Sequence, residues 1–370
     1  MSFYKFNKIL SHDDLHNPNE NGFRKLIHVR IEPTELCNYS CKFCVTQDPD
    51  RIKSIQKDGY DGKDRKFDLN RLSDLLDELK EVGVKAISFV AVGDPLMFPN
   101  ISKVLKKAIK LKFDLGLTSN FGMPLKDEVI ESLSEFKWLR WSMNGGSEEV
   151  YLKTNNPKGK NPAAAYKNAK ENIRRIVLKK KKENKSVLVN ASYVVSEWNY
   201  HDVVNAAKLG RELEIDNLFF RPDMKPMEDR KDIPLDILSK NKPLLDQAME
   251  FQKGNFKISI EQERENDVLK VKDDNLVCFY SNHSIYIAAN GDVYPCCYTR
   301  INPKFVIGNI TNQKFNEFWK DKNNCEKYKE ITLNTCPSCP YNEINQSLKK
   351  LYTTGENFKT NSSEIIDNFV

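Results

Sequence analysis

The chain has 370 residues, 39% hydrophobic and 30% charged, and is long enough for one large α/β domain with a small appended one. No apolar run could span a bilayer and the N-terminal segment has no apolar signal core, so we expect a cytoplasmic protein without a membrane partner. The net charge of +6 includes a lysine run at 179–182, which ends a predicted helix, where the helix dipole favours cations. Aromatic residues do not interleave with the basic ones, so no nucleic-acid partner is expected.

Short β-rich runs alternate with amphipathic helical segments between residues 26 and 256, after an N-terminal extension of residues 1–25. This alternation predicts a partial (β/α)6 TIM-like barrel of parallel strands. Loops at the carboxyl ends of such strands carry the chemistry. The expected strands are residues 26–32, 85–92, 113–119, 138–144, 187–195 and 217–222, with helices between them such as 69–83 and 163–182.

A different pattern begins at residue 257 and predicts a small cluster-binding module over 257–348, followed by a polar tail over 349–370. Asn290 and Gly291 are typical of the tight turn of a β-hairpin. The elements expected in the module are a strand at 257–261, a hairpin at 284–297, a short helix at 316–321 and a cysteine-rich coil.

Nine cysteines form two groups, and in a chain without a secretion signal they predict metal sites rather than disulfides. The first group has the spacing Cys37-x3-Cys41-x2-Cys44, directly after the first expected strand. Three thiolates around a four-iron cluster leave one iron open to a non-protein ligand. Zinc is the alternative, but it would need a fourth ligand, and neither Cys nor His closely follows Cys44.

This cysteine loop, placed after the first strand of a βα repeat, resembles that of the radical S-adenosylmethionine (SAM) superfamily, and the resemblance covers nearly the whole chain. It implies that SAM binds the open iron. It further implies that an electron from a flavodoxin- or ferredoxin-type donor then breaks the sulfur-carbon bond of SAM, which gives methionine and a 5'-deoxyadenosyl radical. It also implies SAM contacts from Phe43 and from three later strand ends, namely Gly93, Asp94 and Pro95, Ser119 and Asn120, and Ser142 and Asn144.

The second cysteine group resembles the twitch domain, a shortened relative of the SPASM domain. The resemblance implies one auxiliary 4Fe-4S cluster, because no further cysteine follows the last pair. A zinc ribbon is the alternative. Cys297 and Cys325 are surplus and predicted to be small buried residues, with Cys297 on the opposite strand face from Cys296. The expected ligands are Cys278, Cys296, Cys336 and Cys339.

These features predict an enzyme of oxidoreductase type that acts on a small polar metabolite, such as a sugar, a nucleoside-sugar or an aminocyclitol. Two alternatives remain open: a maturase of a ribosomally made peptide, and a non-catalytic iron-sulfur or zinc scaffold. Charged residues at or near strand ends are candidates for binding the substrate or moving a proton. They are Glu32, Arg221, Asp223 and Glu261.

Overall fold

The computed structural model describes residues 25–44, 49–62, 65–223, 237–262, 278–332 and 341–354, together with residues 15, 46, 368 and 369. Within these ranges, no helix is both long and apolar enough to cross a lipid bilayer.

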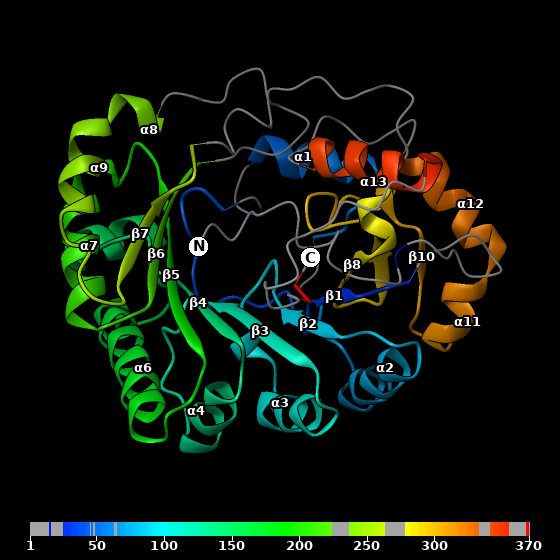
Figure 1. Ribbon diagram of the computed structural model, residues 1–370, viewed down its shortest axis with the longest axis horizontal. Coiled ribbons are helices and arrows are strands. Elements are labelled where there is room, and N and C mark those ends of the chain that lie inside the picture. Colours follow the sequence, from blue (N-terminus) through cyan, green and yellow to red (C-terminus); the bar gives the residue numbers. More distant parts are fainter. Residues whose placement is uncertain are drawn as a thin grey trace.

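The strands form one curved sheet in the order β10-β9-β8-β1-β2-β3-β4-β5-β6-β7 (Figure 1). β1 to β7 run parallel, β8 joins β1 in the same direction, and β9 and β10 are antiparallel additions. The strands are β1 (His28–Ile31), β2 (Ala86–Phe89), β3 (Asp114–Ser119), β4 (Trp138–Ser142), β5 (Leu188–Val195), β6 (Asn217–Pro222), β7 (Lys257–Ile260), β8 (Ser284–Ile287), β9 (Asp292–Tyr294) and β10 (Gly308–Asn309).

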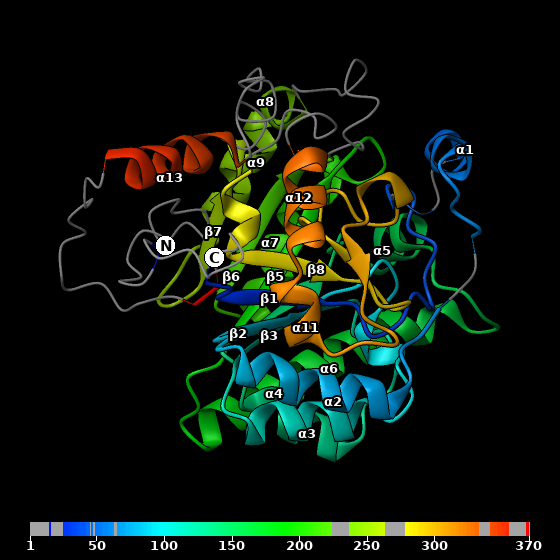
Figure 2. The same cartoon turned by 90° about the vertical axis from the view of Figure 1, so that its right-hand side faces the viewer.

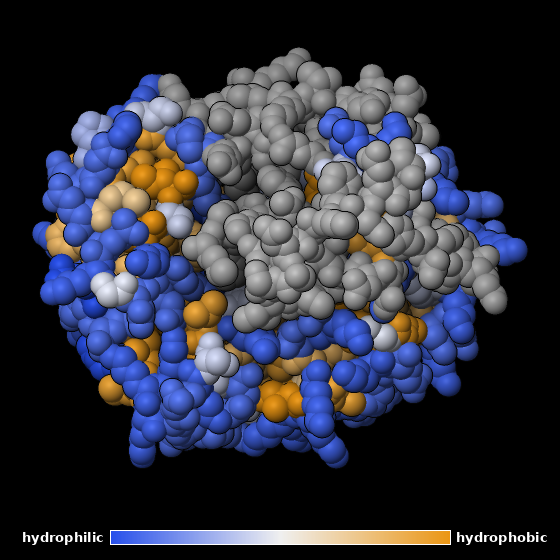
Figure 3. Space-filling view, viewed as in Figure 1, coloured by the Kyte–Doolittle hydropathy of each residue, from blue (hydrophilic) through white to orange (hydrophobic). Residues whose placement is uncertain are grey.

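Helices between the parallel strands cover the convex side of this sheet, and Figure 2 shows α2 and α3 along one side with α13 on the other. The rim of helices seen in Figure 3 is mostly hydrophilic. The helices are α1 (Pro49–Lys57), α2 (Leu69–Glu81), α3 (Ile101–Lys110), α4 (Asp127–Ser134), α5 (Glu148–Asn155), α6 (Pro162–Lys182), α7 (Val203–Glu212), α8 (Ile237–Lys240), α9 (Lys242–Met249), α11 (Phe315–Lys320), α12 (Lys322–Glu330) and α13 (Asn342–Thr354).

Helix α2 illustrates how local sequence produces these elements. The side chain of Asp68 accepts hydrogen bonds from the backbone N–H groups of Asn70 and Arg71 and caps the first turn. Leucines at helical spacing face the sheet and are buried, and the chain leaves the helix at Gly83, whose φ of +88° suits glycine. The helix predicted at 69–83 is therefore present.

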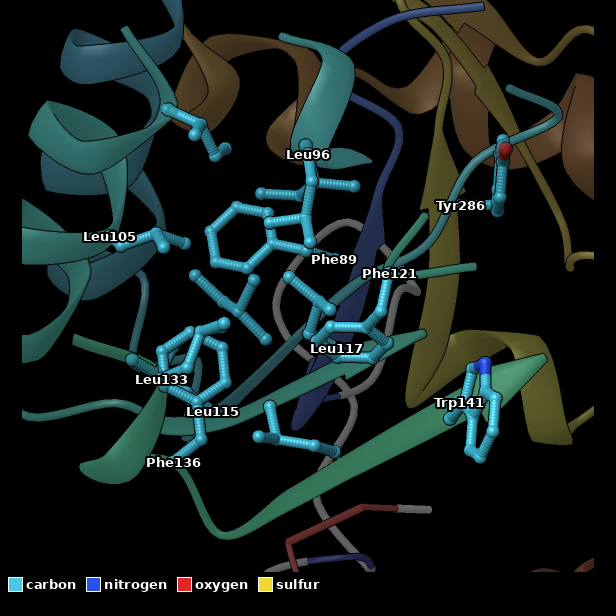
Figure 4. Close-up of a cluster of buried hydrophobic side chains, with 14 of the residues drawn as sticks. Phe89, Leu96, Leu105, Leu115, Leu117, Phe121, Leu133, Phe136, Trp141 and Tyr286 are labelled. Carbon is cyan, nitrogen blue, oxygen red and sulfur yellow. The ribbon is translucent and has the colours of Figure 1, made fainter. Parts of the chain in front are cut away.

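The core lies between the sheet and the helices outside it, and Figure 4 shows part of it around β2, β3 and α4. Along β3, Leu115 and Leu117 point outward into this core, whereas Thr118 lines the inside of the curve. The period-2 alternation of a strand thus separates an apolar outer face from a polar inner one. Phe89, Leu133 and Phe136 pack in the same cluster.

The sheet continues further than the predicted six strands. The strand expected to open the C-terminal module, β7, pairs in parallel with β6, so the predicted boundary at residue 257 cuts through the sheet. The predicted hairpin is present with Gly291 at its turn (φ +81°), but β8 also pairs in parallel with β1. Both pairings join segments distant in sequence, which local patterns do not reveal.

The predicted tail at 349–370 also differs from the structure. Helix α13 continues to Thr354, across the predicted boundary. Phe369 lines the cavity inside the curve of the strands. Its ring centroid lies 5.4 Å from that of His28 and 5.5 Å from that of Trp138. An aromatic side chain therefore lies inside the barrel beside the first residues of β1 and β4.

Replacing Leu117 by Ala should lower the free energy of unfolding by about 2–5 kcal/mol, because it opens a cavity in a completely buried part of the core. Leu178→Ala on α6 is the matched control, since that leucine is 57% exposed and should change stability by less than about 0.5 kcal/mol. Urea unfolding of both variants measures the difference, and equal losses would contradict the assigned core.

Candidate functional site

A cavity of about 510 Å³ lies inside the curve of the sheet, within the size range of small-molecule sites. Cys37, Cys41 and Cys44 all line it. Most of the other predicted SAM contacts line it too, from the strand ends of β2, β3 and β4: Gly93, Asp94, Ser119, Asn120, Ser142 and Asn144, with Phe43 from the cysteine loop. The structure therefore brings together residues spread over more than a hundred positions.

Backbone hydrogen bonds hold the cysteine loop against the end of α5. The N–H of Ser40 donates to the carbonyl of Asn156 (3.0 Å), and that of Lys42 donates to Thr154 (3.1 Å). The N–H of Cys44 donates a hydrogen bond to the carbonyl of Cys41 (3.0 Å), and this bond closes a turn. These bonds fix a loop with little regular secondary structure of its own.

Thiolates are the usual ligands of iron-sulfur clusters, and two of the three thiols have a raised pKa. Burial, with the nearby Asp94 carboxylate, raises the pKa of Cys37 to about 12, and burial with the neighbouring thiols raises that of Cys41. Ligation would therefore release protons. Among the described residues, no three His, Cys, Asp or Glu side chains converge as the ligands of a single metal ion do. A donor set of thiols spread over one cavity wall fits an iron-sulfur cluster.

Asp94 ties the ends of β2 and β3 together. Its carboxylate accepts hydrogen bonds from the hydroxyl of Ser119 (2.9 Å) and from the backbone N–H groups of Asn120 (2.7 Å) and Leu96 (2.9 Å). Burial nevertheless raises its pKa. Pro95 is buried and starts a short 3-10 turn, η2 (Pro95–Met97), rather than lining the cavity. Asp94 thus has a definite structural role besides its predicted contact with SAM.

Close approach explains Gly93. A Cβ there would lie 2.3 Å from the carbonyl oxygen of Leu36, so only glycine lets this loop dock on the cysteine loop. The end of β4 is held by hydrogen bonds instead. Asn144, at a φ of +48°, accepts from the N–H of Val194 (2.9 Å) and donates to Asn155 (3.1 Å).

The four candidate catalytic residues differ in their position relative to the cavity. Arg221 lines the cavity and forms an ion pair with Glu261 (3.1 Å). Asp223 and Glu32 are not among the lining residues. Glu32 is buried behind the wall, where it accepts hydrogen bonds from the Tyr286 hydroxyl and the Val92 N–H, both at 2.7 Å. Burial raises its pKa to about 7, against the lowering effect of the Tyr286 hydrogen bond.

The C-terminal cysteines differ in burial. Cys296 is buried, Cys278 is half-buried with its sulfur 3.6 Å from the amide nitrogen of Asn345, and Cys336 and Cys339 lie outside the described residues. The two surplus cysteines differ from each other. Cys325 is buried in α12, as expected, whereas Cys297 lines the cavity.

Sequence reasoning missed several residues of the cavity wall, above all Arg30, Arg140 and Arg300. A signal for the first exists, because His28, Arg30 and Glu32 alternate along β1, and three polar residues on one face of a buried strand indicate a polar interior. Trp138, Arg140 and Ser142 repeat this pattern on β4. Nothing in the local sequence marks Arg300.

The fold and the site define a parallel partial-barrel protein with a cysteine loop after its first strand and a C-terminal cysteine-bearing hairpin. A model of the radical SAM superfamily matches residues 31–210, and one of the SPASM iron-sulfur cluster-binding domain matches residues 278–340. The chain belongs to the radical SAM superfamily and carries a C-terminal SPASM domain. These two domains imply 4Fe-4S clusters and SAM as cofactors.

The individual proteins that this chain resembles have low sequence identity to it. An S-adenosylmethionine-dependent nucleotide dehydratase of Flammeovirga pacifica is 29% identical over 110 residues, which is 30% of this chain and 36% of that protein. The alignment thus spans about a third of the relative. Streptococcus suis SuiB bound to precursor peptide SuiA superposes with a TM-score of 0.58 at 16% identity, covering 81% of this chain and 66% of that one. AnSMEcpe with bound AdoMet and the Cp18Cys peptide superposes with a TM-score of 0.56 at 18% identity, covering 90% and 97%.

Glu32 should make the protein less stable as pH rises from about 4.5 to about 7. In this window the folded state holds a proton that the unfolded state has released, and the loss, roughly 3 kcal/mol, is complete above pH 7. Glu32→Gln should remove this part of the pH dependence. Unfolding free energies of the cofactor-free protein at pH 5 and pH 8 measure it, with exposed Glu149→Gln as control. Parallel profiles for wild type and Glu32→Gln would contradict the raised pKa.

Asp94→Asn should destabilise the protein by about 1–3 kcal/mol, because an amide NH2 would face donors that the carboxylate now satisfies. The control is Asp246→Asn, whose carboxylate is exposed and pairs only with Lys242 on the same helix. Chemical denaturation compares the two variants. A loss no larger than that of the control would show that the Asp94 network is dispensable for folding.

Proposed function

We propose that this protein is an enzyme that reductively cleaves SAM and abstracts hydrogen from a small polar metabolite of the sugar, nucleoside-sugar or aminocyclitol type, in an oxidoreductase-type reaction. One observation carries the proposal: the three thiols after β1 and the polar ends of β2, β3 and β4 line a single cavity. When bound, the cluster and SAM supply a 5'-deoxyadenosyl radical. Cys37, Cys41 and Cys44 would hold that cluster.

The chain's own residues position the reactants. The loops at the ends of β2 to β4 are fixed by the hydrogen bonds of Asp94 and Asn144, so their polar groups need little rearrangement to contact SAM. The residues proposed for these contacts are Phe43, Gly93, Asp94, Pro95, Ser119, Asn120, Ser142 and Asn144. A flavodoxin- or ferredoxin-type protein would deliver the electron.

A small substrate is supported by the size of the cavity, about 510 Å³, which suits a small molecule. Phe369 packs against both His28 and Trp138, and these three aromatic side chains line the cavity at the start of β1 and β4. The name of the Flammeovirga relative, a nucleotide dehydratase, favours a nucleoside-type substrate. Cys278, Cys296, Cys336 and Cys339 would hold one auxiliary 4Fe-4S cluster that accepts an electron from the substrate.

Four residues are proposed for substrate binding or proton transfer. Arg221 lines the cavity and its partner Glu261 sets its orientation, so this pair is the best placed. Glu32 could exchange a proton near neutral pH, but it lies behind Tyr286 and Val92 and would need a path through the wall. Asp223 directly follows β6, one residue beyond its end.

A second candidate function is the maturation of a ribosomally made peptide. The observation in its favour is that both SuiB and anSMEcpe, which share this fold over most of the chain, have been solved with peptides bound. A third reading, a non-catalytic scaffold, predicts that SAM is not cleaved at all. Incubation of the reduced enzyme with candidate peptides or phosphorylated sugars, followed by mass spectrometry, separates the first two functions.

The anaerobically reconstituted protein should contain about eight irons, and the triple variant Cys37→Ala, Cys41→Ala, Cys44→Ala about four. SAM should change the EPR spectrum of the reduced parent but not that of the variant, and only the parent should form 5'-deoxyadenosine. Iron and sulfide analysis, EPR and chromatography measure these outcomes.

Cys325→Ala is the matched control, because Cys325 is buried in α12 and does not line the cavity. It should retain the iron content and the response to SAM. Zinc in place of iron, or SAM that stays intact under reducing conditions, would refute the catalytic proposal and favour the scaffold.

A further inference from the structure

The cysteine loop and the end of α5 form a short antiparallel ribbon. Besides the two backbone hydrogen bonds given above, the N–H of Lys158 donates to the carbonyl of Asn38 (2.8 Å). Tyr39 and Pro157 pair as an antiparallel bridge between them. We call residues 38–44 and 153–160 the cysteine-loop ribbon. Figure 2 shows α5 on the side of the molecule away from α13.

The ribbon is basic over its whole length, because its two segments contain four lysines and no aspartate or glutamate. All four lysines are exposed, namely Lys42, Lys153, Lys158 and Lys160. None of them forms an ion pair with a carboxylate of the described residues. Lysines on α3 and after α6, in contrast, do so, for example Lys106 with Glu128 and Lys185 with Glu135. The ribbon therefore presents a concentrated positive charge to solvent.

This basic surface lies directly beside the proposed cluster ligands. Lys42 stands between Cys41 and Cys44 in the sequence, and the ammonium of Lys158 donates to the backbone carbonyl of Cys37 (3.4 Å). The three cysteines are only half-buried, so little protein separates them from solvent here. Because the rate of electron transfer falls steeply with distance, an electron donor must approach these residues closely, and the ribbon offers that approach.

We propose that the exposed lysines of the cysteine-loop ribbon form the docking surface for the electron donor, and that this donor is a small acidic electron-transfer protein. The inference rests on the proposed function and adds the place and the charge of the partner. In each encounter the donor loses one electron, and the cluster that the three cysteines would hold gains it. Acidic side chains on the donor complement the lysines, and attraction between opposite charges speeds the encounter.

The composition of the ribbon favours a protein partner over other polyanions. A single-stranded nucleic acid would need exposed aromatic side chains for stacking, but Tyr39 and Phe43 both line the cavity. A lipid surface would need exposed apolar side chains beside the lysines, but the other exposed positions of the ribbon are Asn156 and Gly159. A small charged surface is enough for a transient electron-transfer complex, which buries little area.

The test uses the full-length, anaerobically reconstituted protein and two probes, a flavodoxin and a ferredoxin. Calorimetry measures the binding of each oxidised probe, and stopped-flow absorbance measures how fast its reduced form reduces the enzyme. At least one probe should bind, and salt should weaken its binding because it screens the charges. The double variant Lys42→Glu, Lys160→Glu should bind that probe about tenfold more weakly and accept electrons from it more slowly. With excess dithionite, a small reductant that needs no docking surface, this variant should cleave SAM as the wild type does.

The matched control is the double variant Lys85→Glu, Lys110→Glu. Both lysines are exposed, and they directly precede β2 and end α3, at the end of the strands opposite to the cysteine loop. Lys42→Gln, Lys160→Gln changes the charge by half as much and serves where the glutamate variant loses iron.

Equal donor binding by the ribbon variant and the control variant would overturn the proposal. So would tighter, lysine-dependent binding of a single-stranded oligonucleotide or of phosphatidylglycerol vesicles than of either protein, because the ribbon would then serve another partner. Loss of dithionite-driven cleavage in both ribbon variants would show that the lysines maintain the loop rather than the docking surface, and would overturn it too.

The two proposals fail in different ways. An enzyme that cleaves SAM with dithionite, but binds neither probe through the ribbon, retains the proposed function and loses this inference. A protein that does not cleave SAM with dithionite, yet binds a probe through Lys42 and Lys160, retains the docking surface and loses the enzymatic function.

Discussion

The parallel pairing of β8 with β1 is the constraint on which the site depends. It runs over the whole of both strands, from His28 opposite Ser284 to Ile31 opposite Ile287. The cysteine loop begins a few residues after β1, and Cys296 and Cys297 follow the hairpin that β8 opens. A ladder of backbone hydrogen bonds therefore sets the distance between the two cysteine-bearing regions, and a flexible linker does not.

The side chains around this ladder reinforce it. Glu32, just after β1, bonds to Tyr286 on β8 and to the backbone of Val92 after β2, so one buried carboxylate joins three neighbouring segments. Arg30 bonds across the same ladder to Ser284. Strand alternation directs Arg30 and Tyr286 into the cavity, while the leucines of the same sheet face the helices, so the interior of the barrel is polar. A polar interior gives a cavity that can bind charged and hydrogen-bonding ligands.

Much of this arrangement could be predicted from the sequence, and the remainder has a common physical cause. The strands, helix α2, the hairpin turn and the cysteine loop depend on local spacing and capping, and they were found. The pairing of β7 with β6, the insertion of Phe369 and the position of Arg300 depend on contacts between residues far apart in the chain. Cys296 and Cys297 illustrate this limit: they lie beyond the end of β9, so strand alternation does not place them, and only the fold reveals that Cys296 is buried and Cys297 lines the cavity.

The role of a single candidate residue is harder to predict from the sequence than the location of the group to which it belongs, because the role depends on contacts made in the fold. Asp94, Ser119 and Asn120 were selected because they follow strands, and the structure joins them in one network that leaves few acceptor positions of Asp94 unused. A carboxylate that fixes two loops is a rigid part of the wall, which limits how far it can move towards a ligand. Arg300 is the opposite case, because it lines the cavity and makes one hydrogen bond to the described residues, to the carbonyl of Cys297. Side chains with unused hydrogen-bonding capacity at a cavity wall are the ones left to recognise a ligand, whereas the saturated ones hold the wall in place.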